Sequence, residues 1–390
     1  MTIQSEINRI KQNIADCYTT LTAKGATIPA TENVDNLAAC IRSIPTTPPA
    51  FETQSGDTII TSAGTPLALD GISSLTSAPS VTDSLLTFAD DGNDTVSFSM
   101  QDLKEYVNPV QQVGRFVAVG EGYNISYSDD GVNWTEVPIS IRCSGVGFGN
   151  GKFIATQYGN SSNKIAYSDD GINWTVDNFT SGSFYYNVAY GNNTWVMVGE
   201  SKMFYSTDNG STWTSISGLS GRTIIFANNM FVAGRAYSGT MKYSTDGVNW
   251  YNGTGSGISK STWGIAYGNG KFVATLYDSS TVAYSSNGID WSTSTLPSRS
   301  SWVVASDGSK FVAVSENGSA ISTDGINWTS GTLPISTSWY GMTYNDGRFI
   351  AVGYGNTFIS STDGINWTQL TTTTSTLWHD VAYGLITPQQ

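Results

Sequence analysis

The chain has 390 residues with 18 basic and 31 acidic side chains, which give a formal net charge of −13 at pH 7. This length allows two or three domains, and the acidic balance argues against binding to nucleic acid or to anionic membranes. No run of 18 apolar residues is present, so we expect no insertion into a membrane. The three cysteines, Cys17, Cys40 and Cys143, do not suggest a disulfide framework.

Residues 3–21 are expected to form a helix. Apolar side chains recur every three or four residues along it, at Ile3, Ile7, Ile10, Ile14, Cys17 and Leu21. This spacing predicts either a coiled coil, for which isoleucine at both seam positions favours a homotrimer, or one amphipathic helix packed on its own domain. A second short helix is expected at 34–41. We therefore expect residues 1–44 to anchor or oligomerise the protein.

Residues 45–110 are expected to form a linker and a small β module. Pro45, Pro48 and Pro49 lie at the start of this segment, and clustered prolines are typical of an extended linker. Short strand-like runs follow, with a hairpin turn expected at Asp91 and Gly92 because an Asp-Gly pair suits tight hairpins.

Residues 111–390 contain one short motif seven times, and its clearest copy is YSTDGVNW at 243–250. The copies end 37 to 41 residues apart, at Trp134, Trp174, Trp213, Trp250, Trp291, Trp328 and Trp367. Each complete copy follows an apolar run, a turn and a second run rich in strand formers. A period near 40 residues with tight glycine turns predicts four short antiparallel strands per unit, which is the blade of a β-propeller.

The last run of the chain is expected to complete the first unit. Only one strand-like run, RFVAVG at 115–120, precedes the first motif copy, whereas WHDVAYG at 378–384 matches the first strand of the other units. Pairing of these two runs would leave no free sheet edge. The prediction is therefore an all-β fold: a seven-bladed β-propeller of four-stranded blades with C-terminal strand closure, preceded by a short N-terminal helical segment and a small linker and β module.

The repeated motif resembles the Asp-box of bacterial neuraminidase repeats, S-x-D-x-G-x-x-W, which residues 205–213 match almost letter for letter. The other copies lack one residue between Asp and Gly. In that family Ser and Asp hold the turn, and Trp packs between sheets. Residues 111–390 as a whole look like predicted tail-tip proteins of bacteriophages, and residues 24–44 and 80–107 resemble elements of phage tail and fibre proteins.

This resemblance implies a component of a virion tail or fibre. Such a protein would be made in the cytoplasm of the bacterial host, which agrees with the lack of a secretory signal pattern in the first residues. Residues 1–44 would then contact other tail or baseplate proteins, and the propeller would contact the host surface.

Comparison of the repeated units separates scaffold positions from variable ones, because stacked units use identical residues to hold the fold. The variable positions that carry large, partly polar side chains are candidate ligand-binding residues. At the start of the first strand these are Tyr186, Arg222, Trp263, Trp302, Tyr340 and His379, and after the second strand they are Tyr158, Tyr237, Tyr277 and Tyr354. Aromatic rings beside polar groups suit sugars, and Arg222 is suited to an acidic group.

A structural interpretation of the same residues stays open. Trp263, Trp302 and Tyr340 would also be suitable as core residues at the centre of the propeller, and His379 as a polar residue satisfied by its neighbours.

We expect the propeller to bind a host-surface receptor, above all a glycan, without catalysis and without a cofactor or metal. With one histidine no multi-histidine zinc site is possible, and the arginines do not form the cluster that a neuraminidase needs. Two alternatives stay open. One is a docking module for another virion protein, and the other is a glycoside hydrolase that uses Glu200 and Glu316.

Overall fold

The structure is a computed structural model, and it describes residues 112–159, 164–179, 184–236 and 240–387. It also describes β1 (Leu85–Ala89) and β2 (Thr95–Ser99), which pair antiparallel. The chain divides into two compact units, Met1–Gln111 and Gln112–Gln390. The helices expected at 3–21 and 34–41, and most of the module expected at 45–110, lie outside the described residues. No helix in the described part of the chain could cross a membrane.

Six sheets make up the described part of the second unit, and in four of them four strands pair antiparallel in chain order. The first is β6 (Cys143–Gly149), β7 (Lys152–Gln157), β8 (Lys164–Ser168) and β9 (Thr175–Asn178). The second is β10 (Tyr185–Gly191), β11 (Thr194–Gly199), β12 (Met203–Ser206) and β13 (Thr214–Ile216). The third is β14 (Thr223–Ala227), β15 (Met230–Gly234), β16 (Lys242–Ser244) and β17 (Tyr251–Asn252). The fourth is β23 (Val303–Ser306), β24 (Phe311–Ser315), β25 (Gly318–Ser322) and β26 (Thr329–Gly331).

A fifth sheet has five strands because a short segment from the preceding unit joins its edge. Its strands are β19 (Thr262–Gly268), β20 (Lys271–Leu276), β21 (Ser279–Ser285), β22 (Asp290–Ser300) and β18 (Thr254–Gly255). The added strand β18 pairs with β22 in parallel, through Thr254 and Asp290.

The sixth sheet joins the two ends of the second unit. Its strands, in spatial order, are β27 (Trp339–Asn345), β28 (Arg348–Ser361), β29 (Thr368–Ile386), β3 (Val113–Gly120), β4 (Asn124–Ser128) and β5 (Thr135–Pro138). The strand β29 pairs with β28 up to Leu377 and with β3 from Trp378 onward. The expected pairing of residues 378–384 with residues 115–120 is therefore present.

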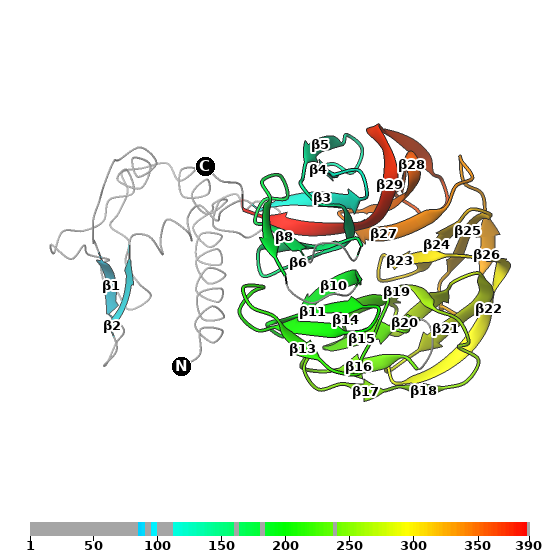
Figure 1. Cartoon of the computed structure of the whole chain (residues 1–390), viewed down its shortest axis with the longest axis horizontal. Helices are drawn as coiled ribbons and strands as arrows, with labels where there is room; N and C mark the ends of the chain where they lie inside the picture. Colours follow the sequence, from blue (N-terminus) through cyan, green and yellow to red (C-terminus); the bar gives the residue numbers. More distant parts are fainter. Residues whose placement is uncertain are drawn as a thin grey trace, which may run out of the picture. The chain divides into compact units, whose positions relative to one another are not determined.

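The sheets stand side by side around a common centre (Figure 1). Neighbouring sheets contact each other through their first strands, in the order β6, β10, β14, β19, β23, β27 and β29, and β29 contacts β6. The core lies between the sheets. One position of the second strand of every unit is at most 1% exposed, at Phe116, Phe153, Trp195, Phe231, Phe272, Phe311 and Phe349.

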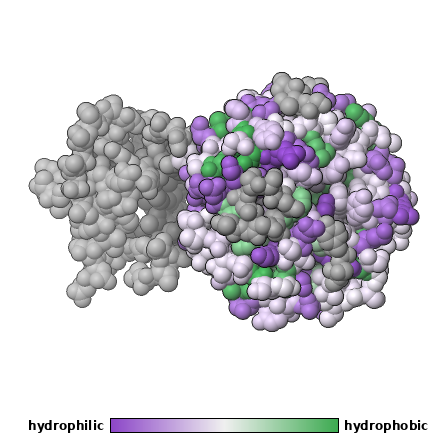
Figure 2. Space-filling model, viewed as in Figure 1, coloured by the Kyte–Doolittle hydropathy of each residue, from purple (hydrophilic) through white to green (hydrophobic). Residues whose placement is uncertain are grey.

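The face of the described residues seen in Figure 2 is a mixture of hydrophilic and near-neutral side chains with small, separate hydrophobic patches. Large exposed apolar side chains include Tyr251 at 58% and Tyr354 at 65% exposure. Scattered apolar residues of this kind are normal for a protein surface, so this view alone does not identify a binding face.

The repeated motif forms one hydrogen-bonded turn, which we call the box turn, and Ser244–Trp250 is a representative copy. The hydroxyl of Ser244 accepts the N–H of Gly247 at 2.8 Å, and one carboxylate oxygen of Asp246 accepts the N–H groups of Val248 and Asn249 at 2.9 and 2.8 Å. The indole N–H of Trp250 donates to the carbonyl of Gly247 at 2.9 Å. Gly247 has φ of +76°, which only glycine adopts at little cost. Ser and Asp therefore hold the turn, as expected.

Replacement of Ser244 by alanine is expected to destabilise the protein. Ser244 is fully buried, and the variant leaves the buried N–H of Gly247 without its acceptor, which costs about 1–3 kcal/mol. Urea unfolding of Ser244→Ala measures the loss, with Ser215→Ala on the exposed face of β13 as the control. Equal midpoints for the two variants would contradict this role of the serine.

Candidate functional site

The candidate residues at the start of the first strand share an irregularity of the backbone. In five of the repeated units, one residue of the first strand has no partner in the pairing with the second strand. These residues are Ser144, Tyr186, Trp263, Tyr340 and His379. Such a bulge turns a side chain away from the usual alternation along the strand. The bulged residues thus point out of the sheets that carry them.

Close contact between neighbouring first strands accompanies these bulges. Gly341 follows the bulged Tyr340, and a Cβ at this glycine would lie 2.6 Å from the Cα of Asp380 on the next first strand. A side chain at position 341 would force β27 and β29 apart. Absence of a side chain therefore lets the bulged residues of adjacent strands approach each other.

Five rings form a continuous series of contacts, which we call the aromatic arc: Tyr277, Trp263, Tyr340, His379 and Tyr158. The centroids of successive rings are 4.9, 6.0, 5.6 and 4.8 Å apart in that order. The rings come from three different sheets, because Trp263 lies on β19, Tyr340 and His379 on β27 and β29, and Tyr158 directly after β7. The ring of sheets therefore assembles the arc from segments far apart in the sequence.

Arg222 lies beside the arc. Its guanidinium carbon is 4.1 Å from the ring centroid of Trp263 and 5.0 Å from that of Tyr186. Such cation–π contacts contribute about 0.5–2 kcal/mol each. The contacts place the positive charge of Arg222 next to Trp263 of the arc, and they place Tyr186 beside the same guanidinium.

A hydrogen-bonded group of ionisable residues lies at the end of the arc that Tyr158 forms. The Nε2 atom of His379 is 3.1 Å from Glu121 Oε1, and Arg142 Nη1 is 3.4 Å from Glu121 Oε2. Because a carboxylate only accepts hydrogen bonds, Nε2 of His379 carries the donated hydrogen. The guanidinium of Arg142 also lies 5.6 Å from the ring of Tyr158.

Burial lowers the pKa of His379 below its ordinary value, and the charge of Arg222 acts in the same direction, whereas Glu121 opposes the shift. Burial raises the pKa of Tyr158, and the carboxylate of Glu121 adds to this shift. At neutral pH the imidazole is therefore uncharged and the phenol protonated, so the arc presents neutral rings between charged side chains.

The remaining sequence candidates do not all belong to this site. Trp302 is 1% exposed and packs in the core, so the prediction that it faces a ligand is wrong. The reason is that β23 pairs with β24 from Val303 without a skipped residue, which leaves Trp302 in the place of the buried Trp339 of the next unit. Tyr354 is 65% exposed and is not a member of the arc. Tyr237 lies outside the described residues.

Sequence reasoning missed Glu121 and Arg142. Glu121 lies five residues after Phe116, and Tyr158 and Tyr277 lie at the same distance from Phe153 and Phe272. The N–H of Glu121 donates to the carbonyl of Leu377, as that of Tyr158 does to the carbonyl of Arg142. A constant spacing from the buried aromatic residue would therefore have added Glu121 to the candidate residues.

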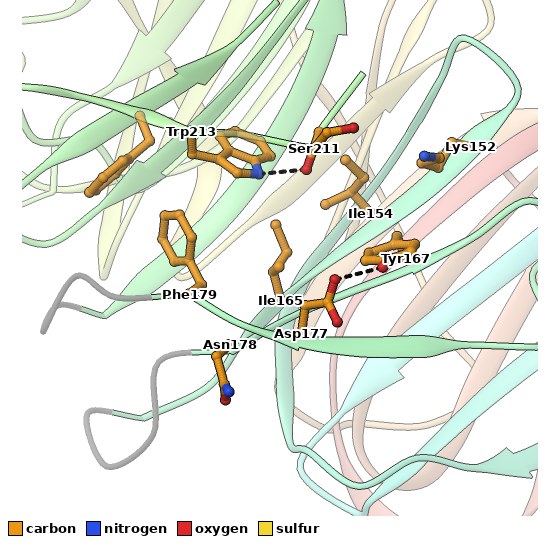
Figure 3. Close-up of a pocket in the computed structure, with 11 residues that line it drawn as sticks. Lys152, Ile154, Ile165, Tyr167, Asp177, Asn178, Phe179, Ser211 and Trp213 are labelled. Atoms are coloured by element: carbon orange, nitrogen blue, oxygen red, sulfur yellow. Dashed lines mark hydrogen bonds between the residues drawn. The ribbon is translucent and has the colours of Figure 1, made fainter. Parts of the chain in front are cut away.

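A pocket of about 570 Å³ lies elsewhere, between the sheets β6–β9 and β10–β13, next to the box turn that ends at Trp213 (Figure 3). Phe179 and Trp213 form one wall, with ring centroids 6.1 Å apart. The hydroxyl of Tyr167 donates to Asp177 at 2.6 Å on the opposite side. None of the candidate residues lines this pocket, so it is separate from the arc.

No family model matches the chain, and no curated protein matches it. The chain is similar to several solved structures. A streptogramin B lyase is 13% identical with a TM-score of 0.55, over 63% of this chain and 89% of that chain. Virginiamycin B lyase from Staphylococcus aureus is 13% identical with a TM-score of 0.52, over 67% and 95%. YCF48 bound to D1 peptide is 18% identical with a TM-score of 0.48, over 60% and 83%.

This likeness corrects the prediction that the chain is not an enzyme. Two of the similar structures are lyases by name, so a propeller of this type does not exclude catalysis. At identities of 13% the likeness shows the fold alone. In the residues that the structure describes, the chain has an all-β fold of the β-propeller type, with several four-stranded antiparallel sheets.

Proposed function

We propose that this protein is a component of a virion tail or fibre and that its propeller binds a glycan on the host surface through the aromatic arc. The resemblance of residues 111–390 to phage tail-tip proteins supports the place in the virion. The series of ring contacts from Tyr277 to Tyr158 carries the binding function.

We also propose that the propeller has seven blades, one for each box turn. The closed series of contacts between first strands supports this number. In this interpretation the six-stranded sheet holds two blades, which β29 joins where its pairing passes from β28 to β3 at Leu377 and Trp378. The hydrogen bonds of the box turns support the likeness to Asp-box repeats.

The chemistry of the arc suits a sugar. A pyranose ring has apolar C–H faces that pack against aromatic rings, and its hydroxyl groups need polar partners. Tyr277 at one end of the arc is 48% exposed, so an aromatic face is accessible there. Glu121 and Arg142 at the other end, with Arg222 in between, supply hydrogen-bonding groups beside the rings.

Replacement of Trp263 by alanine is expected to weaken glycan binding about tenfold or more, because a central aromatic contact contributes about 2 kcal/mol. Trp263 contacts Tyr277, Tyr340 and Arg222, so the variant separates the exposed Tyr277 from the rest of the arc. A glycan array identifies the ligand of the wild-type protein, and titration calorimetry then measures the affinity of each variant.

Two further variants control for loss of structure. Trp263→Phe keeps an aromatic ring and should retain part of the affinity, and Tyr251→Ala removes a tyrosine that is 58% exposed on the outer strand β17. Thermal unfolding shows whether each variant is folded. Full affinity in a folded Trp263→Ala variant, or no glycan bound by the wild-type protein, would overturn the proposed function.

A further inference from the structure

The pocket between the sheets β6–β9 and β10–β13 has two chemically different sides (Figure 3). Phe179 and Trp213 form one of them, and the ring centroid of Phe204 lies 5.0 Å from that of Phe179. Tyr167 and Asp177 form the other, joined by their hydrogen bond of 2.6 Å. The volume of about 570 Å³ is typical of small-ligand sites, which measure about 300–1,000 Å³. The pocket therefore has the size and the two kinds of surface that a small amphipathic ligand needs.

Asp177 departs from the pattern of the repeated units. It pairs with Ile165 across β8 and β9. At the same place of this pairing, five other units have the uncharged residues Val137, Ile216, Ser294, Gly331 and Leu370. Asp177 is exposed, and within the described part of the chain only its Oδ2 atom accepts a hydrogen bond. Because repeated units use the same residues to hold the fold, a carboxylate in one unit alone is not required for stacking.

The box turn beside the pocket also differs from the other six. Asn209 lies between Asp208 and Gly210, whereas in the other copies an Asp or Asn directly precedes the glycine. The side-chain oxygen of Asn209 accepts the indole N–H of Trp195 at 3.0 Å. Its carbonyl accepts a hydrogen bond of 3.4 Å from Nζ of Lys152, which lines the pocket. The additional residue therefore holds the ammonium group of Lys152 at the pocket.

The two charges of the pocket balance each other. Among the described residues that line it, Lys152 and Asp177 are the charged ones. Lysine has three hydrogen-bond donors and a carboxylate has two acceptor oxygens, so both groups can bind a further partner. A balanced pair of charges gives no preference for an ionic ligand. Donors and acceptors opposite aromatic rings suit a ligand that has hydroxyl groups and an apolar C–H face.

We propose that this pocket is a second saccharide site, separate from the aromatic arc, and that it binds a neutral mono- or disaccharide. A C–H face of the sugar packs on Phe179 and Trp213, while its hydroxyl groups donate to Asp177 and accept from Lys152. The indole N–H of Trp213 donates to the carbonyl of Gly210 at 3.0 Å, which fixes the ring before a ligand arrives. Such preorganisation reduces the entropy that binding costs.

The test uses Trp263→Ala protein, in which the aromatic arc is interrupted, so that the pocket is measured alone. The probes are maltose, cellobiose, lactose and N,N′-diacetylchitobiose, titrated by saturation-transfer-difference NMR. Adding Phe179→Leu should weaken binding of the best probe about tenfold, because leucine has no ring face for the sugar. Other units have aliphatic residues at this place, Ile139, Leu296 and Leu333, so thermal unfolding should change little.

Asp177→Asn in the same protein should weaken binding about fivefold, because a hydrogen bond to a charged acceptor is roughly twice as strong as one to a neutral acceptor. Asp346→Asn removes the same charge from an exposed residue in the turn between β27 and β28, and it should leave the affinity unchanged. If Trp263→Ala protein binds none of the probes, or if neither Phe179→Leu nor Asp177→Asn weakens binding, the pocket is not a saccharide site. The function proposed for the arc would stand in both cases, since it depends on the effect of Trp263→Ala itself.

Discussion

A chain that ends at Leu377 is expected not to fold into the closed ring of sheets. The missing residues include the part of β29 that pairs with β3, so the truncated protein leaves the edge of β3 unpaired. They also include Trp378, Val381 and Ile386, which are between 0% and 4% exposed. Burial of a large apolar side chain stabilises a fold by about 1.5–3 kcal/mol, and the total stability of a domain is about 5–15 kcal/mol. The deletion therefore removes a stabilising free energy comparable to the total stability of a domain.

Circular dichroism and thermal unfolding measure this effect. The control is a chain that ends at Thr387, which keeps all of β29 and should unfold as cooperatively as the full chain. The shorter chain should show no cooperative transition. If it melts cooperatively within a few degrees of the control, the pairing of β29 with β3 does not hold the ring together.

The general architecture follows from the sequence because each repeated unit buries an aromatic residue at the same position of its second strand. Phe116 and Phe349 are both buried at the same position of the second strand, and both lie 12 residues before the serine of their box turn. The pairing of residues 378–384 with residues 115–120 was predictable for the same reason: a unit that lacks its first strand needs one from elsewhere in the chain.

The candidate site was only partly predictable from the sequence. It depends on bulges in the first strands and on contacts between distant segments, and neither gives a clear sequence pattern. A bulge adds one residue to a strand, so an alignment that ignores bulges placed Trp302 together with Trp263, although one is in the core and the other in the arc. The glycine that follows some bulges, such as Gly341, is one trace. Contacts such as that between Tyr158 and His379 form only when the ring closes, and no local pattern encodes them.

Replacement of Asp380 by asparagine is expected to stabilise the protein at alkaline pH and to have little effect in acid. Asp380 follows the bulged His379 on β29, and it accepts hydrogen bonds from Val146 on β6, from Asn187 on β10 and from the N–H of Val381. Despite these three donors, burial raises the pKa of the carboxyl group from 3.8 to about 7. The folded state therefore holds this proton more tightly than the unfolded state does.

The sign of the effect follows from linkage. Below about pH 4 the carboxyl group is protonated in both states, and it has no influence on the pH dependence of stability. Between about pH 4 and pH 7 the unfolded state ionises and the folded state does not, so stability falls as the pH rises, by up to about 4 kcal/mol for a shift of this size. Above about pH 7 the full loss is present. Asparagine does not ionise, so the variant avoids this loss. Its free energy of unfolding should exceed that of the wild type increasingly from about pH 4 upward, and the difference should be fully developed near pH 8.

Urea unfolding of wild type and Asp380→Asn near pH 8 and near pH 4 measures this window, and Asp307→Asn provides a control of opposite sign. Burial acts to raise the pKa of Asp307, but hydrogen bonds from Lys310 and Ser309 outweigh it and lower the pKa to about 2. Asp307→Asn should therefore destabilise near pH 8. If Asp380→Asn destabilises equally at both pH values, the carboxylate acts as a hydrogen-bond acceptor that asparagine cannot replace. In that case its charge does not weaken the contact of β29 with β6 and β10, on which the closed ring depends.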